Sequence, residues 1–320
     1  MPKIFIGPMS KNVVDGCIKF SKDHNQKIGL IPSRRQVDKF GGYSNDWTTK
    51  SFFEYSKSDT ITLVRDHAGP LQGEKEDDGQ ESLIEDCQYF DYIHIDPWKN
   101  AKNLDDGIAQ TIDLISLCEK QDCKPKGYEI GTEEAIFQYS PNDLYRIIKE
   151  VSFKVPNVKY AVIQSGTALS ENSNTGIYDK ARLSEMVDVC DSFGLISKEH
   201  NGDFLPPGLV QEKFSLGLDS INIAPEFAQI ETKVYMDLMS KENRVDLLEF
   251  FYALCKGSNK WVKWFPKGFD PDTNKNAVIL ASGHYTFSYA KFGMISRHFP
   301  QAQDMVISNV SNRLRELHGI

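Results

Sequence analysis

Short apolar runs alternate with amphipathic segments along most of the chain. Eight runs have the composition of buried β-strands, at residues 3–7, 28–32, 60–65, 91–96, 127–131, 159–164, 195–199 and 220–224. Segments with helical spacing lie between and after them, at residues 12–24, 48–57, 80–90, 104–122, 142–152, 178–193, 206–216 and 226–240. Ser140 and Pro141 mark one helix start, because serine caps helices and proline suits their first turn.

Strand–helix alternation repeated eight times predicts parallel strands joined by right-handed crossovers. Eight units favour a closed (β/α)8 barrel over an open sheet. We therefore predict an α/β protein, with a single (β/α)8 TIM barrel over residues 1–240. Residues 241–320 lack this rhythm, so we predict a mainly helical C-terminal extension packed on the barrel.

Composition narrows the class of protein. The chain has 320 residues, 40% of them apolar, and a net charge of -8, which disfavours a nucleic-acid-binding surface. No apolar run is long enough to span a membrane, and the first residues turn polar too quickly for a secretory signal. The six cysteines are scattered without a Cys-x-x-Cys pair, which fits a reduced cytoplasm. We expect a cytoplasmic protein with a small-molecule partner, without nucleic-acid or membrane partners.

The third predicted strand ends in Asp66 and His67, and Gly69-Pro70 then breaks it. A carboxylate and an imidazole buried at a strand end are costly unless they are paired or bound to something. Catalytic groups of (β/α)8 barrels lie at the carboxyl ends of the strands. The pair is therefore a candidate for a base beside a metal ligand. The acidic stretch at 73–79 that follows predicts a solvated loop, with a lid as the alternative.

The other strand ends are also rich in polar residues. They supply Arg34, Arg35, His94, Asp96, Glu129, Glu133, Gln164, His200, Asn201, Asp203, Asn222 and Glu226. His94 has two interpretations, a hydrogen-bonded core histidine or a residue that faces the helices. Asp96 either takes part in catalysis or caps the segment that follows it. Strand periodicity alone leaves open whether Glu129 or Glu133 enters the pocket.

His67 and His200, together with a carboxylate from the fifth strand, make a nitrogen and oxygen set that suits a divalent ion. We favour zinc, with manganese as the alternative. Gln164 could complete the set, although an amide oxygen is a weak ligand. Two histidines on non-adjacent strands are a moderate signal for such a site.

Six motifs resemble the tagatose-bisphosphate aldolase non-catalytic subunit family. They are collinear over roughly residues 1 to 230, and they comprise QVDKFGGY at 36–43, RDHAGP at 65–70, IHID at 93–96, IGTE at 130–133, IQSG at 163–166 and HNGDF at 200–204. That family belongs with the class II aldolases, which are metal-dependent (β/α)8 barrels. Its relatives include ketose and uronate 4-epimerases and subunits that assist a catalytic aldolase.

The resemblance implies a role for each matched residue. Asp66 resembles the aldolase acid/base, and His67 and His200 resemble metal ligands. Glu133 resembles the glutamate near the metal, and Asn222 resembles the asparagine that contacts substrate. We assign catalysis to Asp66, Glu133 and Asp96, and metal binding to His67, His200 and Glu133.

The chain also departs from the aldolase pattern. Gln164 stands where class II aldolases offer a further histidine, so the set of three histidines is incomplete. Asp203 and Glu226 place negative charge where those enzymes hold a phosphate, and they would repel it. Arg34 and Arg35 could receive an anion from another side, and the alternative is a differently charged or neutral sugar. Substrate binding is assigned to Arg34, Arg35, Gln164, Asn201, Asp203, Asn222 and Glu226.

Three hypotheses for function follow, in order of preference. The first is a metal-dependent epimerase or aldolase of a sugar or sugar phosphate, with 4-epimerisation favoured. The second is a non-catalytic partner subunit of a tagatose-bisphosphate-type aldolase. The third is a metal-free sugar isomerase or a sugar-binding barrel. Trp261, Trp264 and Phe265 suit either a homo-oligomer or core packing, and His284-Tyr285 are candidates to reach the pocket from the extension.

Overall fold

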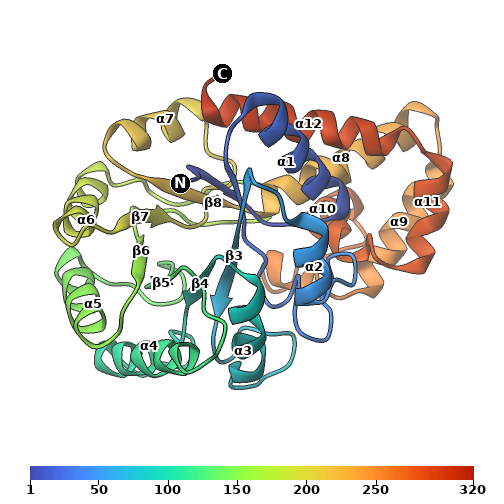
Figure 1. Cartoon of the computed structure of the whole chain (residues 1–320). Coiled ribbons are helices and arrows are strands. Elements are labelled where there is room, and N and C mark those ends of the chain that lie inside the picture. Colours follow the sequence, from blue (N-terminus) through green and yellow to red (C-terminus); the bar gives the residue numbers. More distant parts are fainter.

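Eight parallel strands close into a barrel in chain order in the computed structural model, which describes residues 1–320 (Figure 1). The strands are β1 (Ile4–Ile6), β2 (Ile28–Leu30), β3 (Ile61–Ala68), β4 (Tyr92–Ile95), β5 (Gly127–Ile130), β6 (Val158–Ile163), β7 (Ile196–Glu199) and β8 (Ser220–Ile223). Pairing of β8 with β1 closes the barrel. The predicted TIM barrel is confirmed.

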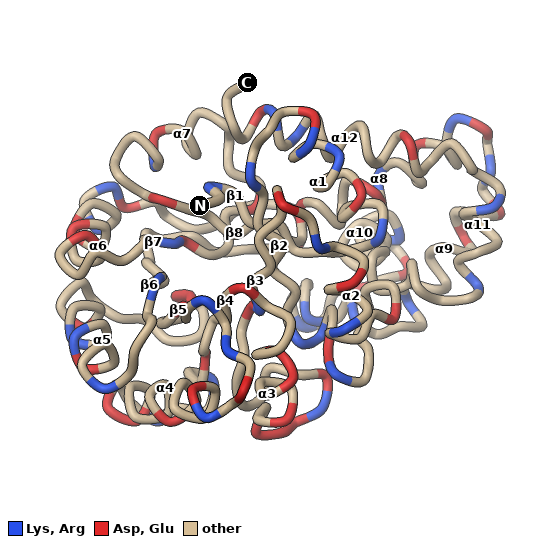
Figure 2. Tube along the Cα trace, viewed as in Figure 1, with Lys and Arg blue, Asp and Glu red and all other residues tan.

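A helix follows each strand and covers the outside of the barrel. These helices are α1 (Lys11–His24), α2 (Thr49–Ser56), α3 (Gln80–Tyr89), α4 (Leu104–Glu119), α5 (Pro141–Lys154), α6 (Lys180–Ser192), α7 (Pro207–Ser215) and α8 (Pro225–Lys241). Figure 2 shows acidic and basic residues interspersed along them. At α5, Ser140 accepts a hydrogen bond from the backbone of Asp143, so the predicted start of this helix is confirmed.

The interior of the barrel is filled by side chains. Phe5, Ile31, Val64 and Tyr160 form a small apolar cluster there. Lys198 lies against it, with its Nζ 3.9 Å from the centre of the Phe5 ring. Because the interior is packed in this way, space for a ligand remains at the carboxyl ends of the strands.

The last part of the chain is helical, as predicted. It contains α9 (Val245–Gly257), α10 (Lys275–Ser282), α11 (Gly293–His298), α12 (Ala302–His318) and the short 3-10 helices η1 (Val262–Trp264), η2 (Gly283–Thr286) and η3 (Ala290–Phe292). Helix α12 packs along α1 and α8 (Figure 1). A Cβ atom at Gly16 of α1 would lie 2.6 Å from Val310 of α12, so glycine permits the close approach of these helices. None of the helices has the length and apolar character needed to cross a membrane.

Candidate active site

A cavity of about 360 Å³ opens at the carboxyl ends of the barrel strands. Asp66, His67 and His200 line it, and Glu133 and Asn222 face it from the ends of β5 and β8. The extension contributes to the same cavity, because Lys263, Trp264 and Tyr285 form part of its wall. The site is therefore built by barrel loops and by the C-terminal helices together.

An irregularity in β3 places Asp66 and His67 in the same cavity. Adjacent residues of a regular strand point to opposite faces. Here the pairing of β3 with β4 shifts register between Arg65 and Ala68, and His67 adopts a φ of 47°, in the left-handed region. Bulges of this kind often lie next to active sites, where they re-aim a side chain. β3 also continues to Ala68, beyond the predicted end of this strand at residue 65.

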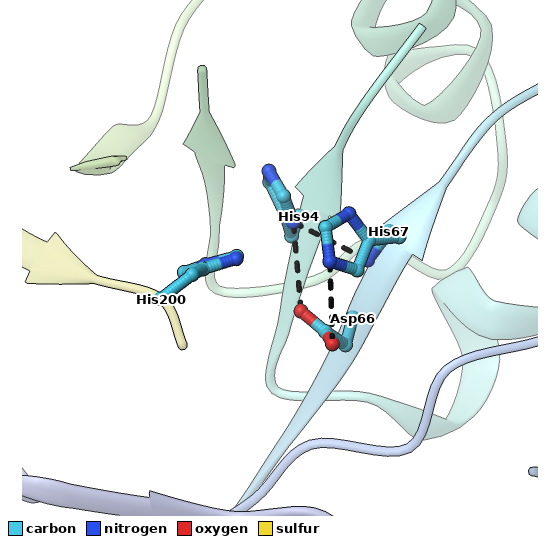
Figure 3. A group of neighbouring side chains, drawn as sticks. All are labelled: Asp66, His67, His94 and His200. Carbon is cyan, nitrogen blue, oxygen red and sulfur yellow. Dashed lines mark hydrogen bonds and ion pairs between the residues drawn. The ribbon is translucent and has the colours of Figure 1, made fainter. Parts of the chain in front are cut away.

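Asp66, His67, His94 and His200 form a group that could hold a metal ion (Figure 3). Each offers one ligand atom, and these atoms all lie within 4.8 Å of one another. Asp66 and His67 come from β3, His94 from β4, and His200 from the residue after β7. Three imidazoles and a carboxylate are a donor set that suits zinc.

The two nitrogens of each histidine face different surroundings. The outer nitrogen of His67, Nδ1, lies 2.5 Å from an oxygen of Asp96. Nε2 of His200 lies 2.8 Å from Glu129, and Nε2 of His94 lies 2.9 Å from the carbonyl oxygen of Gly131. Such bonds fix the ring and leave the other nitrogen as the donor toward a metal.

The inner nitrogens converge on two carboxylates. Nε2 of His67 lies 3.6 Å from Asp66 and 3.6 Å from Glu133. Nδ1 of His94 lies 3.6 Å from Asp66, and Nδ1 of His200 lies 3.9 Å from Glu133. Nδ1 of His94 also accepts a hydrogen bond of 3.2 Å from the backbone N–H of His67, and this bond would have to be exchanged for a metal ion before His94 could act as a ligand.

The charges of this group are strongly coupled. Burial disfavours the charged form of Asp66, but the neighbouring imidazoles outweigh burial and hold the pKa of this carboxyl well below its ordinary value. Burial likewise opposes charge on His67, yet Asp66, Asp96 and Glu133 raise the pKa of its imidazole to about 10. The carboxylates therefore make a site that attracts positive charge.

Glu129 supports the group from inside the barrel. Its second oxygen lies 2.7 Å from Nζ of Lys198, and both side chains are buried. Burial alone would raise its pKa, but Lys198, His94 and His200 hold the pKa of Glu129 well below its ordinary value. A charged Glu129 can thus accept a hydrogen bond from the N–H at Nε2 of His200.

Several residues predicted to bind substrate lie at the cavity. Asn222 places its amide nitrogen 3.5 Å from Asp66, and its buried amide oxygen has no hydrogen-bond partner. Asn201 donates to Glu133 over 3.2 Å. Arg35 lines the cavity too. Asp203 also lines it, but it accepts bonds from the backbone of residues 224 and 226 and so caps the start of α8.

Three other predicted residues are not brought to the cavity. Gln164 is saturated by structural bonds, since it donates to the carbonyls of residues 132 and 137 and accepts from Arg182. Arg34 is buried in ion pairs with residues 38 and 77. Glu226 pairs with Arg313 of α12. These side chains hold loops and helices together.

His94 and Lys263 were not assigned to the site from the sequence. His94 is fully buried and faces the metal-ligand group, so the suggestion that it faces the helices is wrong. The spacing of His94 and Asp96 was a usable signal, because residues two apart in a strand share a face. For Lys263 no local signal exists, since its position depends on how the extension packs.

Several solved proteins share the (β/α)8 fold of this chain. A solved "probable tagatose 6 phosphate kinase" from Sinorhizobium meliloti 1021 has a TM-score of 0.81 at 14% identity, with 99% of each chain covered. The fructuronate-tagaturonate epimerase UxaE from Cohnella laeviribosi has a TM-score of 0.64 at 10% identity, covering 99% of this chain and 81% of that one. Fructose-bisphosphate aldolase from Campylobacter jejuni has a TM-score of 0.61 at 12% identity, covering 99% and 89%. No protein-family model and no curated protein sequence matches the chain.

Proposed function

We propose that the protein is a metal-dependent sugar or sugar-phosphate epimerase or aldolase that acts on a ketose, with 4-epimerisation favoured. The observation that carries the proposal is the convergence of three histidines and Asp66 at the carboxyl ends of β3, β4 and β7. The likeness in fold to sugar aldolases and to an epimerase supports the same reaction class.

The residues present fit a divalent metal ion, with zinc favoured and manganese as the alternative. His67, His94 and His200 would hold it, each with its other nitrogen already bonded to a carboxylate or a carbonyl. His94 would then be the third metal ligand, a role for which the sequence suggested Gln164. When bound, the ion would supply Lewis-acid polarisation of the ketose carbonyl and hydroxyl groups.

The side chains of the chain account for the proton transfers. Asp66, kept ionised by the surrounding imidazoles, accepts the proton of the C4 hydroxyl of a 2-ketose. The C3–C4 bond then breaks, C4 becomes an aldehyde carbon, and the electron pair passes into the enolate of the other fragment. Re-addition of the enolate to the opposite face of the aldehyde, with return of the proton, gives the 4-epimer. Protonation of the enolate at C3 by the second acid/base, followed by release of both fragments, gives aldol cleavage.

Glu133 and Asn222 complete the assignment. Glu133 faces His67 and His200 across the cavity, where it serves as the second acid/base. Asn222 faces Asp66 and has a free amide oxygen, which suits a hydrogen bond from a substrate hydroxyl. Asp96 orients His67 and acts through that ring.

A test is to incubate a panel of ketoses and ketose phosphates with the chelator-treated protein, with zinc or manganese added, and to follow epimerisation and cleavage by NMR. We expect epimerisation or cleavage of at least one ketose, at a rate that falls by at least about 100-fold in Asp66→Asn. Glu76→Gln is the matched control, because this exposed carboxylate lies in the loop after β3 and outside the cavity. Unchanged turnover in Asp66→Asn would contradict the proposal.

A further inference from the structure

Three basic side chains lie at the rim of the catalytic cavity. Arg35 follows β2, Lys99 follows β4, and Lys263 belongs to η1 of the extension. All three line the cavity that contains Asp66 and His67. They come from segments far apart in the sequence, so the fold is what gathers this positive charge.

None of these three cations forms an ion pair. Arg35 donates only to the carbonyl oxygen of Gly73, over 3.3 Å, and Lys99 donates to the side-chain oxygen of Gln72, over 2.5 Å. Nζ of Lys263 has no hydrogen-bond partner and lies 5.0 Å from the Trp264 ring.

Two neighbouring basic side chains, by contrast, form ion pairs. Lys260, three residues earlier, is paired with Glu74, and Arg34 is paired with Asp38 and Asp77. The positive charge at the rim is therefore left open on the side that faces the cavity.

Arg35 disfavours the charge of both lysines. Burial, reinforced by Arg35 and Lys260, lowers the pKa of Lys263 to about 8. Burial and Arg35 also lower the pKa of Lys99. An anion between these groups would relieve the repulsion and gain charge-assisted hydrogen bonds.

We propose that Arg35, Lys99 and Lys263 form a binding subsite for the anionic terminal group of the substrate. This inference rests on the proposed function, since it places the sugar chain between the rim and the histidines. A phosphate monoester is favoured over a carboxylate, because it carries nearly two negative charges at neutral pH and meets three cations. The subsite is formed by the segments that follow β2 and β4 and by η1 of the extension.

The test is calorimetric binding of inorganic phosphate, and separately of a hexuronate, to the metal-free full-length protein. We expect Lys263→Met and Lys99→Met each to weaken binding of one of these probes by about tenfold or more. Lys263→Arg should restore most of the affinity, because it keeps the charge. The matched control is Lys267→Met, because Lys267 is an exposed lysine shortly after η1 that does not line this cavity.

Each outcome decides the proposal. Loss of phosphate binding supports the subsite and identifies a phosphate, whereas loss of hexuronate binding alone supports it and identifies a carboxylate. If the Lys263 and Lys99 variants bind both probes like the Lys267 variant, or if the unaltered protein binds neither, the subsite is overturned. Epimerisation or cleavage of an uncharged ketose by the metal-loaded enzyme would leave the proposed function standing in that case.

Discussion

The two nitrogens of each site histidine have different roles. One nitrogen is fixed by Asp96, Glu129 or the carbonyl of Gly131, and the other faces the centre of the group. The rings are therefore oriented before a cation arrives, although His67, whose pKa is raised to about 10, must release a proton and His94 must give up its bond from the backbone N–H of His67. The cost of ordering the site is met during folding, which favours tight binding.

Substitution of His94 should lower metal affinity, whereas substitution of Gln164 should not. Because His94 faces the group and Gln164 does not, His94→Gln should weaken zinc binding by more than about 100-fold, beyond the 10–100-fold range of an outer partner. Gln164→Ala should leave zinc affinity within about threefold and reduce stability instead, because it strips buried carbonyls of a donor. Competition with a chelating dye measures the affinity. Equal zinc affinity of the unaltered protein and the His94→Gln variant would show that His94 is not a metal ligand.

Part of this site could be predicted at the level of single residues. Asp66, His67 and His200 were visible because they stand where predicted strands end. Whether Glu129 or Glu133 faces the ligand could not be settled, because both lie near the end of β5 and the backbone turns at Gly131, with a φ of 97°. The structure places Glu133 at the cavity and Glu129 beneath His200.

At the level of elements, buried charges connect helices to strands. Arg65 of β3 points away from the cavity and binds Asp86 of α3 through two bonds of 2.8 and 2.7 Å. It also donates to the backbone carbonyls of Pro32 and Val37. The same strand thus presents Asp66 to the ligand and anchors itself to the neighbouring helix through the preceding residue.

Arg65→Met tests this anchor. The variant leaves Asp86 buried without its cation, so we expect the free energy of unfolding to fall by about 3–5 kcal/mol. Chemical denaturation measures the change. Arg65→Met combined with Asp86→Leu should recover much of the loss, because the uncompensated charge is gone. If Arg65→Met were as stable as the unaltered protein, the Arg65–Asp86 ion pair would make no net contribution to stability.

Glu231 of α8 gives the fold a pH-dependent contact with the start of α1. It bonds to Ser10 and, over 2.7 Å, to Asn12. Burial raises its pKa to about 7, against the opposing effect of these bonds. In the unfolded chain the proton is lost near pH 4.5, so the contribution of Glu231 to stability falls as pH rises from about 4.5 to 7.

Glu231→Gln should remove this dependence. Relative to the variant, the unaltered protein should lose up to about 3 kcal/mol of unfolding free energy between pH 4 and pH 8. Urea denaturation at several pH values measures the difference between the two proteins. A difference that stays constant over this range would show that Glu231 titrates normally.

Element positions could be predicted because periodicity and capping residues act locally. The β3 bulge could not, because the register shift at His67 depends on pairing with β4. The packing of the extension was equally inaccessible, since the glycine contact between α1 and α12 joins residues far apart in the chain.

At the level of the whole molecule, metal binding should stabilise the folded chain. An ion that binds only the folded state at about 100 times its dissociation constant adds about 2.7 kcal/mol. For a domain of this size we expect zinc to raise Tm by roughly 3–6 °C and chelation to reverse the change. The shift should vanish in His200→Gln and persist in His298→Gln, whose histidine lies on α11 away from the cavity. A shift of equal size in both variants would place the metal elsewhere.

The barrel and the extension contribute different kinds of residues to the wall of the cavity. The groups assigned to proton transfer and metal binding all stand on the barrel, whereas Lys263, Trp264 and Tyr285 reach the same space from the extension. Changes confined to the final quarter of the chain can therefore alter which ligand fits the cavity while Asp66 and the histidines stay in place. For a protein engineer, this makes residues 261–286 the natural cassette for exchanging substrate preference between related barrels.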